Sequence, residues 1–251
     1  EEVLKEAQAL GYAEADPTFD VEGIDAAHKL TILAAIAFGI PLSFSEIYTE
    51  GISSVTPIDV QHASELGYRI RHLGIAKKLR NVVELRVHPT LVPDQEMLAQ
   101  VDGVMNAVMV GGDAAGATMY YGAGAGAGPT ASAVIADIVD VARFGRNLPN
   151  VGFSQIKTAQ ISDIESIFSA YYLRLGVRDK PGVLAHVSSI LGAHDVSIEL
   201  LSQKDSRPSD PQIVIITNEV AESAINAAIN QLNSLDEVTS GVNRIRVADL
   251  R

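Results

Sequence analysis

The sequence predicts an α+β protein with a mixed sheet and helices, and three observations support this class. The 251 residues are 47% hydrophobic and 20% charged, the balance of a globular protein, which excludes extensive disorder. Strands and helices are both indicated within the first 145 residues. From residue 170 onward they follow the order β-α-β-β-α-β. This length suits one large or two modest domains.

The acidic balance and the lack of cysteine limit the function classes. A formal net charge of −12 argues against nucleic acid and anionic membranes as partners, because phosphates would not be neutralised. Without cysteine, disulfides, thiolate metal sites and cysteine nucleophiles are excluded, and a cytoplasmic location is expected. The longest apolar stretch, Leu30–Leu42, is short of the roughly 20 residues of a membrane span. The opening helix pattern has no start Met or N-cap signal, so we expect a cut N-terminus.

The first region, residues 1–145, begins with a helix that ends near Leu10 and a loop over residues 11–22. Gly23–Phe38 is typical of a strongly apolar helix, which Gly39 should stop. The further expected elements are a helix over Pro57–Leu66, strands over Tyr68–Lys77 and Val82–Val87, a short helix or turn at Glu96–Leu98, a buried strand over Met105–Val110, a turn over Gly111–Gly116, a strand over Ala117–Tyr121 and a helix over Thr130–Phe144.

Residues 146–169 are expected to form a linker, because the stretch contains Gly, Pro and Asn and starts without a strong period. Net charge also changes near it, from −10 over residues 1–169 to −2 over residues 170–251. The expected elements of residues 170–251 are strands over Tyr171–Val177, Val196–Gln203, Gln212–Thr217 and Val242–Val247, and helices over Gly182–His194 and Ala221–Leu235. Their order is that of the ferredoxin-like fold.

An acid-rich loop leads into one lysine. The acids are Glu14, Asp16, Asp20, Glu22 and Asp25, and Lys29 follows. Asp25 and Lys29 lie four residues apart, so they share one face of the expected helix. An ordinary explanation is a solvated loop and a surface ion pair. The spacing does not fit a calcium-binding EF-hand loop, and no metal site is indicated. The sharper hypothesis is an active-site lysine held among carboxylates.

The run AQALGYAEADPTFDVEGIDAAHK, residues 7–29, resembles the catalytic-domain signature of homoserine dehydrogenases. GIPLSFSEIYTEGI and VDGVMNAVMV extend the resemblance over most of residues 5–144. It implies that Glu14 binds the ammonium group of L-homoserine, and that Asp20 and Asp25 help to bind this substrate, Asp20 shaping the loop together with Asp16. It further implies that Asp25 orients Lys29, which exchanges a proton with the carbinol oxygen.

The run YYGAGAGAGPTASAV places glycines between an expected strand and an expected helix. Gly122-x-Gly124-x-x-Ala127 matches a relaxed dinucleotide fingerprint, but no strand follows the helix, so this is not the main dinucleotide site. One interpretation is a tight turn capped by Thr130. The other is a set of exposed backbone N–H groups that suits a polar cofactor edge. Homoserine dehydrogenases carry a similar loop, which implies that Gly122, Gly124 and Gly126 face the nicotinamide end of NAD or NADP.

The run YYLRLGVRDKPGVLAHVSSILGAHDVSIELLSQ resembles ACT domains, the regulatory modules of many amino-acid pathway enzymes. The resemblance implies a pocket for an amino-acid effector, threonine before others, usually between paired domains. Gln203 is either a ligand contact or the end of a strand. The alternative is an oligomerisation module with an empty pocket. The residues expected to contact the effector are Asp179, Pro181, Gly182, Val183 and Leu184.

Together these features predict an oxidoreductase of threonine and methionine biosynthesis, feedback-regulated by an amino acid. By resemblance it forms a homodimer or homotetramer, and its nucleotide-binding domain normally precedes this region, so little activity is expected from the chain alone. Two other hypotheses remain: an amino-acid-sensing oligomer without catalysis, and a carboxylate-dependent hydrolase. The hydrolase is weak because no metal-spaced His pair or nucleophile elbow occurs. His88 lies in a family segment, but a lone histidine is more often structural.

Overall fold

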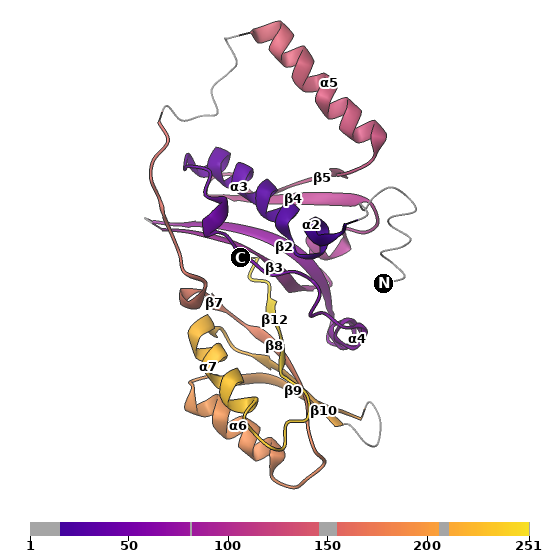
Figure 1. Ribbon diagram of the computed structural model, residues 1–251, viewed down its shortest axis with the longest axis vertical. Helices are drawn as coiled ribbons and strands as arrows, with labels where there is room; N and C mark the ends of the chain where they lie inside the picture. The colour runs from indigo at the N-terminus through magenta and orange to yellow at the C-terminus, as the bar shows by residue number, and fades with distance from the viewer. Residues whose placement is uncertain (1–15, 81, 146–154, 206–210, 251) are drawn as a thin grey trace.

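A mixed eight-stranded sheet forms the centre of the molecule, as the predicted α+β class requires (Figure 1). The computed structural model describes residues 16–80, 82–145, 155–205 and 211–250. Six strands follow the order β1-β3-β12-β8-β10-β9, and β2 and β6 also pair with β3. Within the described residues, no helix has the length and apolarity needed to span a membrane.

The longest strand pair is formed by β2 (Tyr68–Leu79) and β3 (Val82–Pro93), which pair antiparallel along their whole length. Both strands were predicted, and both are longer than the sequence indicated. Alternate residues of β3 (Val83, Leu85 and Val87) form a buried cluster with Ala27, Leu30 and Ala34 of α3 (Ile24–Phe38). This packing fixes α3, and therefore Lys29, against the sheet.

Helix α3 begins and ends at glycines in the left-handed region, Gly23 with φ 77° and Gly39 with φ 66°. The predicted bounds are therefore confirmed, because only glycine adopts this conformation at low cost. The predicted loop before it is partly wrong, since Thr18–Val21 forms the short helix α2. The Asp16 carboxylate accepts hydrogen bonds from the backbone N–H and the hydroxyl of Thr18, which organises the start of this turn.

Helix α4 (Pro57–Glu65) begins with a capping box, in which Thr56 and Asp59 bond each other's backbone and side chains. The sequence predicted this helix and its Pro57 start. The predicted turn at Glu96–Leu98 corresponds to the short 3₁₀ helix η2. The remaining short elements of the first region are η1 (Phe44–Glu46), β1 (Tyr48–Thr49) and η2 (Met97–Gln100).

Strands β4 (Met105–Gly112) and β5 (Gly116–Ala123) form a separate two-stranded sheet that leads into helix α5 (Ala127–Phe144). Two predictions are wrong here. β4 is not buried: half-buried and exposed residues alternate over Met105–Val110, and Gly111 and Gly112 are exposed. The helix begins at Ala127 instead of Thr130, because Gly126 (φ 110°) turns the chain three residues earlier. Figure 1 shows α5 apart from the central sheet.

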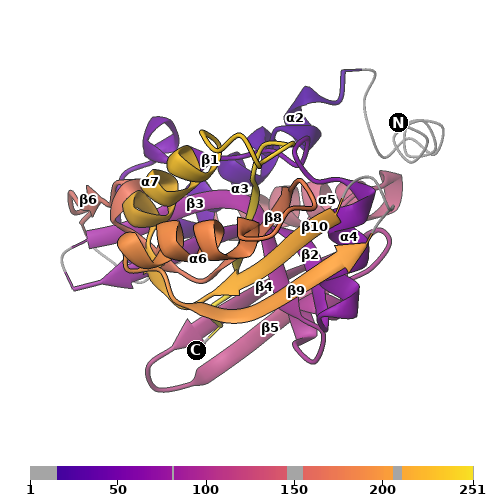
Figure 2. The same ribbon diagram turned by 90° about the horizontal axis from the view of Figure 1, so that it is seen from below.

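The C-terminal unit, residues 171–247, has the predicted β-α-β-β-α-β order and a four-stranded sheet, β12-β8-β10-β9. Figure 2 shows its two helices lying over these strands. Its core joins Tyr171, Leu173 and Leu175 of β8 to the apolar faces of both helices. The elements are β8 (Tyr171–Gly176), α6 (Val183–Ala193), β9 (Ile198–Asp205), β10 (Pro211–Thr217), α7 (Glu222–Leu232) and β12 (Asn243–Val247).

The two regions share one sheet, which the sequence did not reveal. β12 pairs antiparallel with β8 and parallel with β3, in the register Arg246↔Thr90 and Val247↔Leu91. The described part of the expected linker is also structured, because β6 pairs with β3 and β7 pairs with β11. The elements of this stretch are β6 (Gln160–Ile161), η3 (Ile164–Ser166) and β7 (Phe168–Ser169). Strand β11, the partner of β7, spans Val220–Ala221.

Candidate functional site

Lys29 and Asp25 form the ion pair that their spacing predicted. The Lys29 Nζ lies 2.5 Å from Asp25 Oδ2, on the first two turns of α3. The side chains are 62% and 45% exposed, so the pair faces solvent in this chain. An amine in this position is open to a ligand, while the carboxylate restricts where it points. The geometry is compatible with proton transfer at Lys29 and equally with a surface ion pair.

The other loop acids are only partly described. Asp20 is exposed on α2, three residues before Gly23, the glycine that starts α3. Asp16 is committed to Thr18, and these hydrogen bonds hold the pKa of its carboxyl below the usual range. Asp16 therefore shapes the loop, whereas Asp20 is free to reach outward. Glu14, expected to bind the substrate ammonium, lies outside the described residues.

In the glycine loop, residues 122–126, the backbone lies very close to a neighbouring side chain. Gly122 pairs with Asn106 across the hairpin, and a Cβ on Gly124 would lie 2.1 Å from the Asn106 side chain. Gly126 (φ 110°) starts the 18-residue helix α5, and Thr130 does not cap it. Gly122 and Gly124 are exposed and Gly126 is half-buried, so part of this backbone is accessible to a ligand. Among the described residues, no hydrogen bond joins this loop to α2 or α3.

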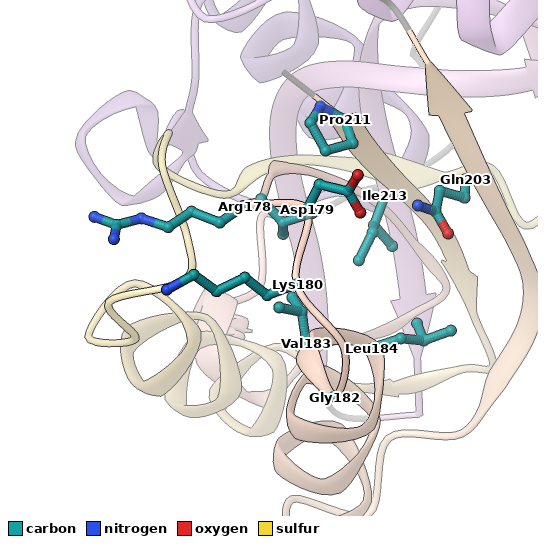
Figure 3. A pocket seen from close by; sticks show the side chains of 10 residues that line it. Arg178, Asp179, Lys180, Gly182, Val183, Leu184, Gln203, Pro211 and Ile213 are labelled. Carbon is teal, nitrogen blue, oxygen red and sulfur yellow. The ribbon is translucent and has the colours of Figure 1, made fainter. Parts of the chain in front are cut away.

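A cavity of about 90 Å³ opens where β8 meets α6 in the C-terminal unit. Asp179, Ile213 and Gln203 point toward a common space, whereas Arg178 and Lys180 extend away from it (Figure 3). Pro181, which the resemblance placed there, does not line the cavity. Its lining residues are Val177, Arg178, Asp179, Lys180, Gly182, Val183, Leu184, Gln203, Pro211 and Ile213.

The cavity thus combines a carboxylate, an amide and apolar side chains beside the N-terminus of helix α6. Gly182 (φ 94°) precedes α6, whose first N–H groups lack partners within the helix. The arrangement offers a carboxylate for an ammonium group, backbone donors for a carboxylate and an apolar wall. Such a site suits a small amino acid better than a nucleotide or a sugar, because the cavity is small and carries both kinds of polar group.

His88 lies on a buried polar face of β3, not on the surface that carries Lys29. It is 1% exposed, and its Nδ1 is 3.0 Å from the Thr90 hydroxyl. Burial lowers the pKa of His88 well below its usual range, and the Arg246 charge lowers it further, so the ring is neutral. His88 is therefore enclosed at the joint between the two regions.

Sequence reasoning missed the polar groups at this joint. Arg246 of β12 is 1% exposed and donates to Glu222 and Glu50, while Arg174 of β8 donates to the buried Asp59 of α4. The only sequence signal was two arginines, two residues apart, in the short strand Asn243–Val247. Their partners lie far away along the chain, so no local pattern could have identified them.

Comparison with known proteins defines the family. Residues 1–139 match the homoserine dehydrogenase family model, and residues 171–237 match the ACT domain model. A homoserine dehydrogenase of Pseudomonas aeruginosa is 55% identical over 99% of this chain, and one of Neisseria gonorrhoeae is 50% identical over 99%. In both cases the chain spans 59% of the relative's length.

Solved structures agree. The crystal structure of a homoserine dehydrogenase from Thiobacillus denitrificans superposes with a TM-score of 0.91 at 53% identity, over 100% of this chain and 58% of that one. The Staphylococcus aureus enzyme gives a TM-score of 0.72 at 33% identity, over 100% of this chain and 59% of that one. With its first region matched by one family model and its C-terminal unit by the other, the chain belongs to the homoserine dehydrogenase family and carries an ACT domain.

Proposed function

We propose that this chain supplies the substrate-binding and regulatory parts of an NAD- or NADP-dependent enzyme that interconverts L-homoserine and L-aspartate 4-semialdehyde. The observation that supports this most directly is the Asp25–Lys29 pair at 2.5 Å, on the helix that follows the acid loop. Family membership supplies the reaction type, and the ion pair supplies a plausible proton carrier. Most of the chain, residues 1–145, is then the catalytic and dimerisation domain, residues 146–169 the connection and residues 170–251 the regulatory domain.

In this proposal Lys29 exchanges the proton of the substrate's terminal oxygen. Asp25 accepts a hydrogen bond from the Lys29 ammonium, which orients it. Asp20 and Glu14 bind the substrate ammonium, so that the reacting carbon is fixed relative to Lys29. In the direction of homoserine oxidation, the lysine must be neutral when it takes the proton, and the nearby carboxylates then stabilise the ammonium that forms.

The glycine loop fits the polar edge of a nicotinamide. Gly122, Gly124 and Gly126 expose backbone at a helix start, and side chains there would block close approach. When bound, the nicotinamide supplies the acceptor or donor of the hydride. Among the described residues no parallel β-α-β unit follows a glycine fingerprint, so we propose that the rest of the cofactor is bound by sequence beyond these elements.

We propose that the ACT cavity binds an amino-acid effector, with threonine the first candidate. Asp179 would bind the ammonium group and the start of α6 the carboxylate, while Val183, Leu184 and Ile213 would contact the side chain. Gln203 could then accept from or donate to a side-chain hydroxyl. Calorimetric titration with threonine, with serine and methionine as controls, tests this. The absence of heat for all three would leave the unit structural.

The test of the proposed function is an assay of the enzyme that contains this chain. L-homoserine should reduce NADP or NAD, whereas L-serine, one carbon shorter, should not. Effector binding without any homoserine-dependent reduction would instead favour an amino-acid sensor without catalysis. The ACT cavity is the observation that keeps this second function open.

A further inference from the structure

Arg246, on the last strand of the ACT domain, bonds directly to the first region. Its Nη1 donates to Glu50 Oε2 at 2.8 Å, and its guanidinium carbon lies 5.0 Å from the centre of the Tyr48 ring. The Tyr48 hydroxyl donates to the same Glu50 oxygen at 2.8 Å. On its own side, Arg246 donates to Glu222, which also accepts from the Tyr171 hydroxyl at 2.8 Å. Glu50 is thus hydrogen-bonded by Arg246 and Tyr48, and Arg244 Nη2 lies 3.6 Å from the same Glu50 oxygen.

The pKa directions of Arg246 and Glu222 both favour the ionised forms of these two side chains. Burial lowers the pKa of the Arg246 guanidinium, but the hydrogen bonds and charges of Glu222 and Glu50 outweigh burial and raise it overall. Burial raises the pKa of Glu222, and Arg246 in turn outweighs that effect and lowers it. A buried ion pair of this kind contributes specificity of arrangement more than net stability. It fixes where Glu50 lies relative to the ACT domain.

The residues that follow Glu50 contact the end of the acid loop. The Ile52 N–H donates to the Val21 carbonyl at 2.9 Å, and the Ser53 hydroxyl donates to Glu22 at 2.8 Å. A Cβ on Gly51 would lie 2.6 Å from both the Val21 carbonyl oxygen and a Glu22 carboxylate oxygen. The segment therefore lies against the junction of α2 and α3 at a distance that only glycine permits.

The other side of this junction is fixed by His72. Its Nε2 donates to the Glu50 carbonyl at 2.9 Å, and a Cβ on Gly23 would lie 2.6 Å from the His72 ring. Residues 21–23 are thus enclosed between residues 50–53 and His72. Asp20 lies just before this enclosed junction, while Asp25 and Lys29 lie just after it.

We propose that Glu50 is a positioning residue, through which Arg246 of the ACT domain holds the substrate-binding turn of residues 20–29 in place. This inference rests on the proposed function, because it concerns the same site. Glu50 touches no reacting atom: it acts through the backbone of residues 51–53. Loss of its charge frees Arg246 on one side and the junction on the other, so that Asp20 and Asp25 shift relative to each other. Through the same contact, the ACT domain influences the affinity of this turn for the substrate.

The test uses Glu50→Gln, Arg246→Lys and the double variant in the enzyme that contains this chain. Each single variant should raise the KM for L-homoserine at least about fivefold, with a smaller change in kcat. The double variant should add little to either single one, because both interrupt one connection. The KM for NADP should stay within about twofold, since the affected turn contacts the amino acid and not the cofactor.

Asp59→Asn and Arg174→Lys are the matched controls. This pair is also buried and also joins the two regions, with Arg174 Nε 2.6 Å from Asp59 Oδ1, but it does not contact residues 50–53 or 21–23. These variants should lower Tm while leaving the KM for L-homoserine within about twofold. A Glu50→Gln enzyme that loses Tm but keeps its KM, or control variants that raise KM equally, would overturn the inference.

Hydrogen exchange tests the same idea without an activity assay. In the 251-residue chain, Glu50→Gln should speed exchange of the amides of Val21, Glu22 and Ile52, whereas Asp59→Asn should not. Unchanged exchange at these amides would contradict the proposed connection. The two failures are distinguishable: an unmodified enzyme without homoserine-dependent turnover refutes the proposed function, whereas normal turnover with an unchanged Glu50→Gln KM and exchange refutes only the role of Glu50.

Discussion

Lys29 is the residue on which the proposed chemistry depends most. In the enzyme that contains this chain, Lys29→Ala should lower kcat by at least about 100-fold, because general acid–base catalysis typically contributes that much or more. Asp25→Asn should also lower kcat, since it removes the partner 2.5 Å from the ammonium. Lys78→Ala, at an exposed lysine on β2, is the control and should have little effect. Wild-type-like turnover of Lys29→Ala would reduce the pair to a surface ion pair.

Gly23 is the residue on which the position of α3 depends. Its φ of 77° costs any other residue about 1–2 kcal/mol, and a Cβ would also lie 2.6 Å from the His72 ring. Gly23→Ala should therefore lower the free energy of unfolding by at least that amount, measured by urea denaturation. Gly67→Ala is a useful comparison: it shares a positive φ (80°) but has open space around its Cβ, so its smaller loss isolates the cost of the backbone.

At the scale of elements, the Asp59–Arg174 contact joins α4 to β8 and determines an acid sensitivity. Burial raises the pKa of Asp59, but the hydrogen bonds from Arg174 and Thr56 outweigh burial, so its pKa lies below the usual 3.8. A lowered folded pKa stabilises the protein above about pH 4, and this contribution is lost as pH falls through the folded pKa. Arg174→Met should cost about 3–5 kcal/mol at neutral pH, because it leaves a buried carboxylate unpaired.

That cost should shrink below about pH 4, where Asp59 can take up a proton in the variant. Urea denaturation at neutral pH and at pH values below 4 measures how much Arg174→Met lowers the free energy of unfolding at each pH. Arg69→Met is the comparison, since its partner Asp94 is 43% exposed and the pair is screened by water. A cost for Arg174→Met that stays constant with pH would mean that lost packing, not the charge of Asp59, is responsible.

The elements that the sequence predicted well are those whose signals are local. Gly23 and Gly39 mark the two ends of α3, and Pro57 marks the start of α4, because each residue restricts or permits particular backbone angles. The pattern of apolar residues likewise predicted the four long strands and the two helices of the C-terminal unit, but not the two-residue strand β11. Helix α5 was misplaced by three residues for the same reason: Gly126, not Thr130, makes the turn.

What the sequence could not reveal is long-range pairing. β12 pairs with β3 across 156 residues of chain, from Thr90 to Arg246, and Arg246 bonds Glu50 across 196 residues. No periodicity encodes such a contact, since each partner has an ordinary local environment. The Lys29 site could be predicted because Asp25 and Lys29 are one helical turn apart in the sequence. The contacts that support this site, from Glu50 to Gly23, form only when the chain folds.

At the scale of the whole molecule, the exposed apolar surface predicts self-association. Tyr120 and Tyr121 of β5 are 69% and 57% exposed, and Val108 and Val110 of β4 add to the same hairpin. Monomeric proteins seldom leave large contiguous apolar patches in water. We expect a homodimer or homotetramer by sedimentation velocity, with Val108→Lys plus Tyr120→Lys shifting it toward monomer. Monomers of the unmodified chain at micromolar concentration would contradict this expectation.

The last prediction concerns which ligands the 251-residue chain binds by itself. The ACT cavity is lined entirely by residues of the C-terminal unit, so the proposed effector site is contained in this chain. In the part of the chain that the structure describes, the element proposed to contact the cofactor is the glycine loop of residues 122–126, and no parallel β-α-β unit follows it to bind the rest of a dinucleotide. The 251-residue chain should therefore bind threonine by calorimetry yet show little or no homoserine-dependent reduction of NADP. Robust turnover by this chain would mean that the described elements already hold the cofactor, and that the glycine loop does far more than its exposure suggests.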